Sequence, residues 1–257
     1  MRRQTGVLFA IIWLEAAGDR LECTETPSRS PEAERLILQA SNEFRLSNNL
    51  PALIWDQTLS DIAYRHSEDM ILRSYFDHLN PDAQTPDERI HRQHRRFIGN
   101  TGENLSVVVG APPLAPASIS EQAIAGWLRS PPHRANILDK AFTHAGIGVA
   151  VKGVEAKITL NFMQVRGILE SPIPEILAPD YEFDLRVVAF PPKNTKPKRY
   201  VLQPLQPDPK RPDPATWPLS TRRPLVKPGR YTIQFCFPVP RSKFLEVFPG
   251  PQIEILE

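Results

Sequence analysis

Apolar side chains recur at helical spacing through the first half of the chain. Ser30 followed by Pro31 predicts a helix start, because a proline at the first helical position has no hydrogen bond to lose. The segment NNLPALIWD, 48–56, breaks the pattern, and a second helix is predicted from about Thr58. The apolar stripes of these two helices are Ala33, Leu36, Ile37, Ala40 and Phe44, and Leu59, Ile62, Ala63 and Met70.

Capping residues mark two further helix starts. Thr85 and Glu88 have the spacing of a capping box, with Pro86 at the first helical position, and they predict a third helix. Ser118 and Glu121 repeat this spacing and predict a fourth helix, which ends within WLRSPP at 127–132.

Alternation replaces helical spacing further along the chain. The segments AGIGVAV at 145–151 and KITLNFMQV at 157–165, separated by KGVEA, predict a β-hairpin. Because helices come first and paired strands last, the pattern indicates an α+β layered domain.

A carboxylate and an amide stand directly before an apolar run. Glu103 and Asn104 precede LSVVV, 105–109, although a strand entering a core normally begins with a turn residue and then alternates. We therefore expect the core to hold the backbone of Glu103 while its carboxylate faces a cleft.

The pattern changes again after Gly167. Residues 171–257 hold 18 of the 28 prolines, which disfavours long helices there. Short segments of strand character predict a small β-sandwich within a proline-rich region, 169–257. The alternative is a proline-rich linker with isolated strands, because 206–220 is a long crossing without a pattern. The predicted strands are 181–190, 199–206, 230–237 and 243–249.

Charge and hydropathy exclude two classes of protein. The net charge of +2 is too small to indicate a nucleic-acid partner, and only HRQHRR, 91–96, is densely basic. A membrane-spanning helix needs about 18 or more consecutive apolar residues, and we expect none in the mature chain.

The first residues are typical of a secretion signal. Arg2 and Arg3 precede an apolar stretch at 6–14 and small residues at 16–18. We therefore expect 1–30 to be a signal peptide and leader, and the mature protein to be secreted or extracytoplasmic. The two cysteines, Cys23 and Cys236, lie at opposite ends of the chain, and their spacing leaves open whether they pair.

Six landmarks within residues 31–168 occur in the order found in one known family. They are NEFRLSNNLPALIWDQTLSDIAYRHSEDM, YFDH, TPDERI, TGENLSVV, AIAGWLRSPPHRANIL, and HAGIGVAV with FMQV. Together they resemble the CAP superfamily, which comprises cysteine-rich secretory, antigen 5 and pathogenesis-related 1 proteins and is also called the SCP domain. The resemblance is to the bacterial branch, which lacks the disulfides of the eukaryotic members. It implies a three-layer α-β-α sandwich with a central cleft.

The resemblance also implies a set of cleft residues. In the family a His, the Glu of the GEN stretch, a second Glu and a second His converge in the cleft. The matching positions here are His78 in YFDH, Glu103, Ser130 and His133 in SPPH. A serine therefore stands where the second Glu is expected, which weakens any mechanism that needs two carboxylates. Asn104 and the tryptophan of the family pattern, Trp127, complete the candidate binding residues.

These side chains suit a divalent metal. The neutral imidazoles of His78 and His133, one carboxylate and a water form a ligand set for zinc, and protonation below about pH 6 would release the ion. The alternative is that Glu103 accepts hydrogen bonds from nearby backbone N–H groups while the histidines are polar residues of the cleft.

Three other histidines have plainer interpretations. His66 lies on the apolar stripe of the second helix, which predicts a structural histidine. His91 and His94 are one turn apart, but the surrounding arginines would repel a cation, so we expect a solvated basic face there.

Three classes of function remain. The first is a secreted binding protein whose cleft holds a metal, or a small, lipidic or peptide ligand, with a cell-surface component as a further candidate partner. The second is a metal-assisted hydrolase in which Glu103 activates water. The third is an interaction domain with a vestigial cleft. Ser130 argues against the second class, and the presence of Glu103 with both histidines argues against the third.

Overall fold

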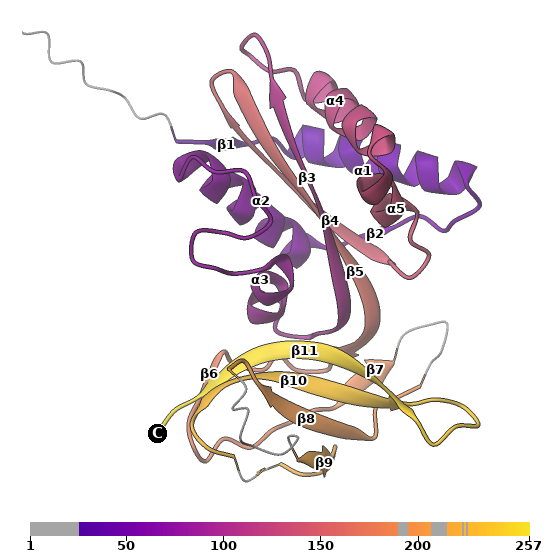
Figure 1. The fold of residues 1–257 in the computed structure, drawn as a ribbon, viewed down its shortest axis with the longest axis vertical. Helices are drawn as coiled ribbons and strands as arrows, with labels where there is room; N and C mark the ends of the chain where they lie inside the picture. The colour runs from indigo at the N-terminus through magenta and orange to yellow at the C-terminus, as the bar shows by residue number, and fades with distance from the viewer. Residues whose placement is uncertain (1–25, 190–194, 207–214, 223, 225) are drawn as a thin grey trace, which may run out of the picture.

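The computed structural model describes residues 26–189, 195–206, 215–222, 224 and 226–257. The predicted signal peptide up to residue 25, and with it Cys23, lies outside the described residues. The described chain forms two sheets, a larger one flanked by all the helices and a smaller one beneath it (Figure 1). Among the described residues, no helix is long and apolar enough to cross a membrane.

The helices begin where the caps predict them, with one exception. Asp56 accepts a hydrogen bond from the Leu59 N–H at 2.7 Å, and the capping box of Thr85 and Glu88 is formed. The fourth helix begins at Pro116, so Ser118 lies inside it and not at its cap. The helices are α1 (Pro31–Ser47), α2 (Gln57–Leu72), α3 (Pro86–Gln93), α4 (Pro116–Arg129) and α5 (Pro131–Leu138), of which α5 was not predicted.

The larger sheet is built around two long antiparallel pairings, β4 with β5 and β5 with β3. Its order is β1-β4-β5-β3, with β2 parallel to β4 and β7 antiparallel to β5. The predicted hairpin is therefore confirmed as the centre of the sheet. The strands are β1 (Ser28–Arg29), β2 (Ile54–Trp55), β3 (Phe97–Val109), β4 (His144–Lys152), β5 (Glu155–Leu169) and β7 (Val187–Ala189).

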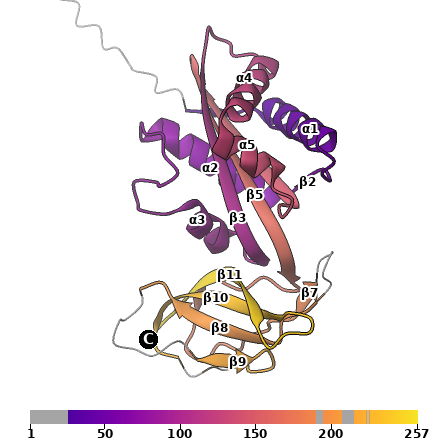
Figure 2. The ribbon, with the colours of Figure 1, turned by 45° about the vertical axis from the view of Figure 1, so that its right-hand side comes forward.

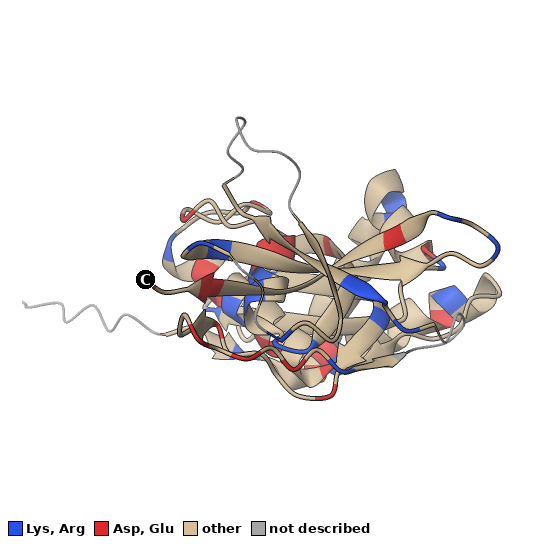
Figure 3. Cartoon of the chain, turned by 90° about the horizontal axis from the view of Figure 1, so that it is seen from below, with Lys and Arg blue, Asp and Glu red and all other residues tan. Residues whose placement is uncertain are grey.

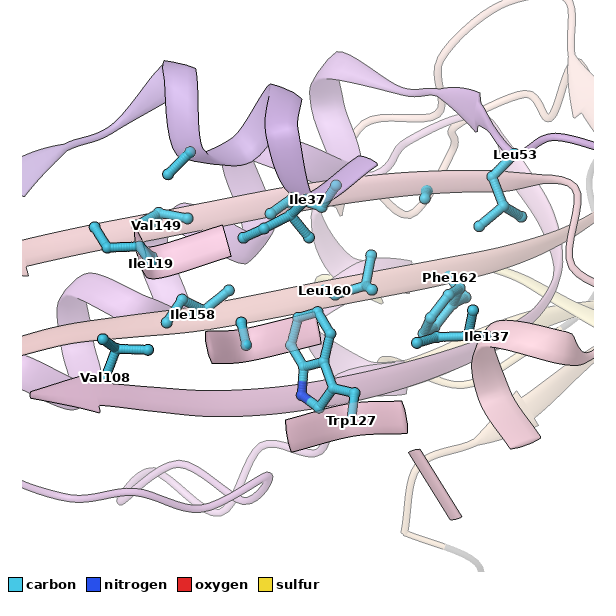
Figure 4. Packing of buried hydrophobic residues seen from close by; sticks show 14 of the residues in the cluster. Ile37, Leu53, Val108, Ile119, Trp127, Ile137, Val149, Ile158, Leu160 and Phe162 are labelled. Atoms are coloured by element: carbon cyan, nitrogen blue, oxygen red, sulfur yellow. The ribbon is translucent and has the colours of Figure 1, made fainter. Parts of the chain in front are cut away.

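Helices cover both faces of this sheet, which confirms the predicted α+β class (Figure 2). One core lies between the sheet and α1 and α4, and it includes Ile37, Trp127 and Leu160 (Figure 4). A second core lies on the opposite face and includes Ile62 of α2 and Ile90 of α3. The two cores make the three layers of an α-β-α sandwich.

The smaller sheet contains five strands in the order β6-β11-β10-β8-β9. One face packs on a core that includes Phe183, Phe235 and Ile253. The described residues of the region form this single sheet with no second sheet facing it, so the expected small sandwich is not what they build; β7 joins the larger sheet instead. The strands are β6 (Ile176–Leu177), β8 (Arg199–Pro204), β9 (Thr216–Pro218), β10 (Gly229–Pro238) and β11 (Leu245–Ile255).

A bulge in β3 brings the two sheets together. The register of β3 against β5 shifts between Ile98 and Gly99, and Gly99 has φ 153°, where a Cβ would lie 1.9 Å from the Gln164 carbonyl oxygen. Beyond the bulge, Ile98 packs in the core of the smaller sheet. Glycine is therefore required where β3 bends toward the second sheet.

Candidate functional site

The candidate site lies at the edge of the larger sheet that β3 forms. Side chains alternate along a strand, so Glu103 and Asn104 point to opposite faces. Glu103 faces the layer of α2 and α3, while Asn104 faces α5. The side chains of the two residues that precede the apolar run therefore make contacts on opposite faces of β3.

Two side chains donate hydrogen bonds to the carboxylate of Glu103. His78 Nδ1 donates to Oε1 at 2.7 Å, and Arg89 Nη2 donates to Oε2 at 2.7 Å. The Glu103 side chain is only 2% exposed, so both of its oxygens are desolvated and both are satisfied. The Glu103 carboxylate at the start of the apolar run therefore accepts hydrogen bonds from two side chains, those of His78 and Arg89.

Arg89 is a residue of this site that the sequence reasoning missed. Its Nη1 donates to the carbonyl oxygens of His78 at 2.7 Å and Gln84 at 2.9 Å, so it holds the loop that carries His78 as well as the carboxylate. The side chain is 6% exposed. The signal was present in TPDERI, because one turn after the helix start an arginine shares a helix face with the capping residues.

The opposite face of β3 positions His133. Asn104 Nδ2 donates to the His133 carbonyl oxygen at 2.9 Å, and Asn136 Nδ2 donates to Asn104 Oδ1 at 2.9 Å. Asn136 also donates to the Glu103 carbonyl oxygen at 3.3 Å. Asn104 is fully buried, so it holds α5 in place and does not present its side chain to a ligand.

Trp127 and Ser130 occupy structural positions. Trp127 is 1% exposed in the core, and its indole N–H donates to the Leu105 carbonyl oxygen at 2.7 Å. The structure therefore places this residue inside the protein and not on a cleft surface. Ser130 joins α4 to α5, and its carbonyl oxygen accepts the Arg134 N–H at 2.9 Å.

Two backbone carbonyl groups at the edge of β3 accept hydrogen bonds from side chains. Asn136 binds the carbonyl oxygen of Glu103, and Trp127 binds that of Leu105. Edge strands expose unpaired backbone groups, and side chains from α4 and α5 satisfy two of them here. The site is therefore built around a closed strand edge, with His78 on one side and His133 on the other.

The two histidines have opposite electrostatic surroundings. The hydrogen bond that His78 donates to Glu103 raises the pKa of His78 above its ordinary value. Burial lowers the pKa of His133, and the charge of His78 lowers it further.

Comparison with known proteins gives these residues a family context. A profile of the CAP family, described as the cysteine-rich secretory protein family, matches residues 38–163. Those residues belong to the CAP family. The match contains His78, Glu103 and His133, so the family resemblance inferred from the six landmarks is confirmed.

Relatives of the CAP domain are found in Bacillus. The chain is 34% identical over 118 residues to the uncharacterized membrane protein YlbC of Bacillus subtilis (strain 168), and 31% identical over 130 residues to the uncharacterized protein YkwD of the same strain. The matches cover 46% and 51% of this chain, and 31% and 47% of the two relatives, so they span less than half the length of either. An extracellular SCP-domain protein of Bacillus anthracis str. Ames has 34% identity and a TM-score of 0.44, over 52% of this chain and 40% of that one.

Glu103 is not placed as a direct metal ligand in this arrangement. Both oxygens of Glu103 already accept hydrogen bonds, and the buried guanidinium of Arg89 lies beside them. Within the described part of the chain, no group of three or more His, Cys, Asp or Glu side chains is arranged to hold a metal. Since His78 uses Nδ1 to bind Glu103, its Nε2 is the atom available for a metal, and Glu103 then orients this ligand from behind.

Three other histidines of the CAP domain, His66, His91 and His94, are buried. His66 is 2% exposed between Asp77 and Tyr75, as a structural histidine should be, and burial lowers its pKa to about 4. His91 is fully buried and stacks on Phe97, with ring centroids 5.1 Å apart. His94 is 8% exposed, so the predicted solvated basic face is wrong. These side chains pack between α3, β3 and the rest of the domain.

A polar groove of about 210 Å³ lies next to the site in the CAP domain. Arg89 belongs both to its lining and to the network around Glu103, and His66 lines the groove as well. Arg89 Nε is buried without a hydrogen-bond partner among the described residues. The other lining residues are Ile62, Arg65, Asp69, Asn80, Asp82, Gln84 and Gln93.

Proposed function

We propose that this protein is an extracytoplasmic binding protein whose CAP domain holds a divalent metal, zinc in the first instance, through His78 and His133. The observation that carries the proposal is the 2.7 Å hydrogen bond from His78 Nδ1 to the buried carboxylate of Glu103. A carboxylate behind a ligating imidazole fixes the tautomer and orientation of the ring, which supports metal binding through Nε2.

The protonation states support the same pair. Burial lowers the pKa of His133, so this imidazole is neutral and able to ligate at pH 7. Glu103 raises the pKa of His78, so a metal competes with a proton there. The bound ion would polarise a ligand carbonyl, phosphate or water. The chain's own residues orient His78, hold the loop before α3 and close the edge of β3.

The arrangement favours binding over metal-assisted hydrolysis. A general base needs an accessible oxygen close to the attacking water. Glu103 is 2% exposed, and its two oxygens accept hydrogen bonds from His78 and Arg89. Ser130, at the expected place of a second carboxylate, supplies no acid or base of matching strength. A small, lipidic or peptide ligand, or a cell-surface component, is the proposed partner.

Two observations support an extracytoplasmic location. The family that matches residues 38–163 is described as secretory, and the first residues have the charged, apolar and small-residue segments of an export signal. Among the described residues the one cysteine is Cys236, which is free and 2% exposed.

Titration calorimetry with zinc tests the proposal. We expect binding by the native protein and a loss of at least about tenfold in affinity for both His78→Ala and His133→Ala, because each removes a direct ligand. Glu103→Gln should weaken binding by roughly 10–100-fold without removing a ligand. Affinity should rise from pH 6 to pH 8, because the raised pKa of His78 makes proton release part of binding.

His144→Ala is the matched control, because this half-buried histidine belongs to the same domain but not to the proposed pair. Its zinc affinity should equal that of the native protein. Equal affinity for the native protein, His78→Ala and His133→Ala would remove the site.

A further inference from the structure

The hairpin that joins β10 to β11 presents apolar side chains at its end. Phe244 is 80% exposed, and Leu245 and Val247 behind it on β11 are 42% and 50% exposed. The turn itself is ordered: the Ser242 N–H donates to the Val239 carbonyl oxygen at 3.2 Å, and the Phe244 N–H donates to Ser242 Oγ at 3.0 Å. An aromatic ring is therefore displayed on a defined turn that projects past the end of the sheet (Figure 1).

Exposed cations lie at the same end of the smaller sheet as these apolar groups. Arg241 and Lys243 are exposed on the turn, on either side of Ser242. Strand β8 and the residues before it add three more at the same end of the sheet, because Arg199 pairs with Cys236 and the Lys198 N–H donates to the Cys236 carbonyl oxygen at 3.0 Å. The five exposed cations are Lys196, Lys198, Arg199, Arg241 and Lys243.

The strand register places charge and apolar surface on one face. Arg199 lies opposite Cys236, and Cys236 lies opposite Val247, so these residues form one row across β8, β10 and β11. The only carboxylate in the described part of this hairpin end is Glu246, which points to the other face, 4.0 Å from Arg166. Figure 3 shows the basic positions at the tip of the hairpin.

Arg166 of β5 anchors the base of the hairpin to the larger sheet. Its guanidinium lies 4.5 Å from the ring centroid of Phe237 on β10 and 5.7 Å from that of Phe248 on β11. The residue is 5% exposed, so these cation–π contacts are shielded from water. The hairpin is therefore held at its base while its tip projects from the molecule.

We propose that this hairpin end, residues 196–199 and 238–247, docks on the surface of an anionic lipid bilayer. Phe244 enters the interfacial region together with Leu245, and the five cations contact lipid phosphates. A bilayer fits this surface because Phe244 and Leu245 project from the end of the hairpin, where they can be buried in an apolar medium. A soluble anionic polymer would satisfy the cations and leave Phe244 in water. The site is separate from the His78 and His133 pair and does not depend on it.

Sedimentation with lipid vesicles tests the proposal on the full chain. We expect binding to vesicles of phosphatidylcholine mixed with phosphatidylglycerol, weak or undetectable binding to phosphatidylcholine alone, and loss of binding as salt is raised. Each lysine or arginine at such a surface contributes about fivefold, so Arg241→Gln with Lys243→Gln should weaken binding by roughly 25-fold. Phe244→Ser should weaken it by about tenfold or more.

Matched control variants lie on the CAP domain. Val109 is 64% exposed on β3, and Arg35 and Lys140 are exposed cations that belong to neither proposed site. Val109→Ser, and Arg35→Gln with Lys140→Gln, should leave vesicle binding within about twofold of the native protein. Thermal unfolding of each variant confirms that it is folded.

Three results would overturn the proposal. One is equal binding to neutral and anionic vesicles. Another is an equal loss of binding for the hairpin and the CAP-domain variants. A third is binding to a soluble anionic polymer that depends on the cations but is unchanged in Phe244→Ser. Sedimentation velocity would show if Phe244 instead joins two copies of this chain, because dimerisation would then disappear in Phe244→Ser.

Discussion

Glu103 shows how a single residue acquires its role from its surroundings. Its backbone belongs to a paired strand, while its carboxylate receives one hydrogen bond from a partly exposed histidine and one from a buried arginine. An unpaired carboxylate at this depth would carry a large desolvation cost, which Arg89 offsets. The same pairing uses Nδ1 of His78, so Nε2 is the atom that we propose to bind a metal.

The lowered pKa of His66 predicts how the stability of the protein depends on pH. Burial lowers its pKa from 6.5 to about 4, so between these values the unfolded chain binds a proton that the folded chain does not. Stability should therefore be fully present above about pH 6.5 and fall as the pH drops toward 4, by about 3 kcal/mol in total from this residue. Urea unfolding at a series of pH values measures the change.

His66→Gln is the test variant, because glutamine can still reach the Asp77 carbonyl oxygen but does not titrate. It should flatten the pH dependence in this window, whatever its effect on the overall stability. A slope identical to that of the native protein would assign the acid sensitivity to other groups. His78→Gln should act at higher pH and in the opposite sense, because the raised pKa of His78 gives stability that is fully present below about pH 6.5 and is lost as the pH rises.

At the scale of elements, the close packing of α2 on β4 supports the layer that carries His78. Ser60 Oγ donates to the Ile147 carbonyl oxygen at 2.6 Å, and Ser67 Oγ donates to the Gly148 carbonyl oxygen at 3.0 Å. Gly148 allows this approach, since a Cβ there would lie 2.0 Å from the Tyr64 nitrogen. Helix and strand are in contact through their backbones.

We expect Gly148→Ala to destabilise the protein by about 1–3 kcal/mol or more, because the added methyl group meets backbone atoms that cannot rotate away. Gly126→Ala is the matched control: Gly126 lies inside α4 with no atom within 4 Å of an added Cβ. That change should stabilise the protein by roughly 0.5–1 kcal/mol, since alanine favours a helix. Chemical unfolding of both variants measures the difference, and equal effects would contradict the packing argument.

At the scale of the whole molecule, the basic segment after α3 joins the two sheets. Arg95 donates to the carbonyl oxygens of Ile173 at 2.7 Å, Pro174 at 2.8 Å and Gln252 at 2.6 Å. Arg96 Nε donates to the Leu169 carbonyl oxygen at 2.7 Å. Arginines expected on a solvated face thus hold the proline-rich region against the CAP domain.

The boundary at 168/169 stays a prediction, and a chain ending at Leu169 tests it. Both cores that flank the larger sheet come from residues before 166, so we expect this chain to fold cooperatively. Its melting temperature should be lower than that of the full chain, because Ile98 and Leu169 lose the core that covers them. Calorimetry measures both quantities.

Arg95→Ala in the full chain is the companion variant. It should lower stability by a few kcal/mol at most, since it removes hydrogen bonds at the junction while both CAP cores stay covered. A chain ending at Leu169 without a cooperative transition would show that the smaller sheet is part of the folding unit.

Interactions between neighbours in the chain determined much of this fold. The proline at Pro31 and the capping box at Thr85 act on residues within one turn, so these two helix starts follow directly from the sequence. Alternation along 145–165 predicted the central hairpin for the same reason, since each signal involves residues close together in the chain. Helix α5 was not predicted, because its eight residues follow Ser130 with two prolines and carry no apolar stripe.

The tertiary structure decided which of the candidate residues share a site. The register of β3 turns Glu103 toward Arg89 and His78, and Asn104 toward His133, and a shift of one residue would have exchanged them. Sequence alone determined the α+β class and the first three helix starts, because those depend on short-range pattern, and the family resemblance supplied the layers and the identity of the candidate groups. Partners, burial and pKa depend on contacts between residues far apart in the chain, and only the folded arrangement of the strands and helices supplies them.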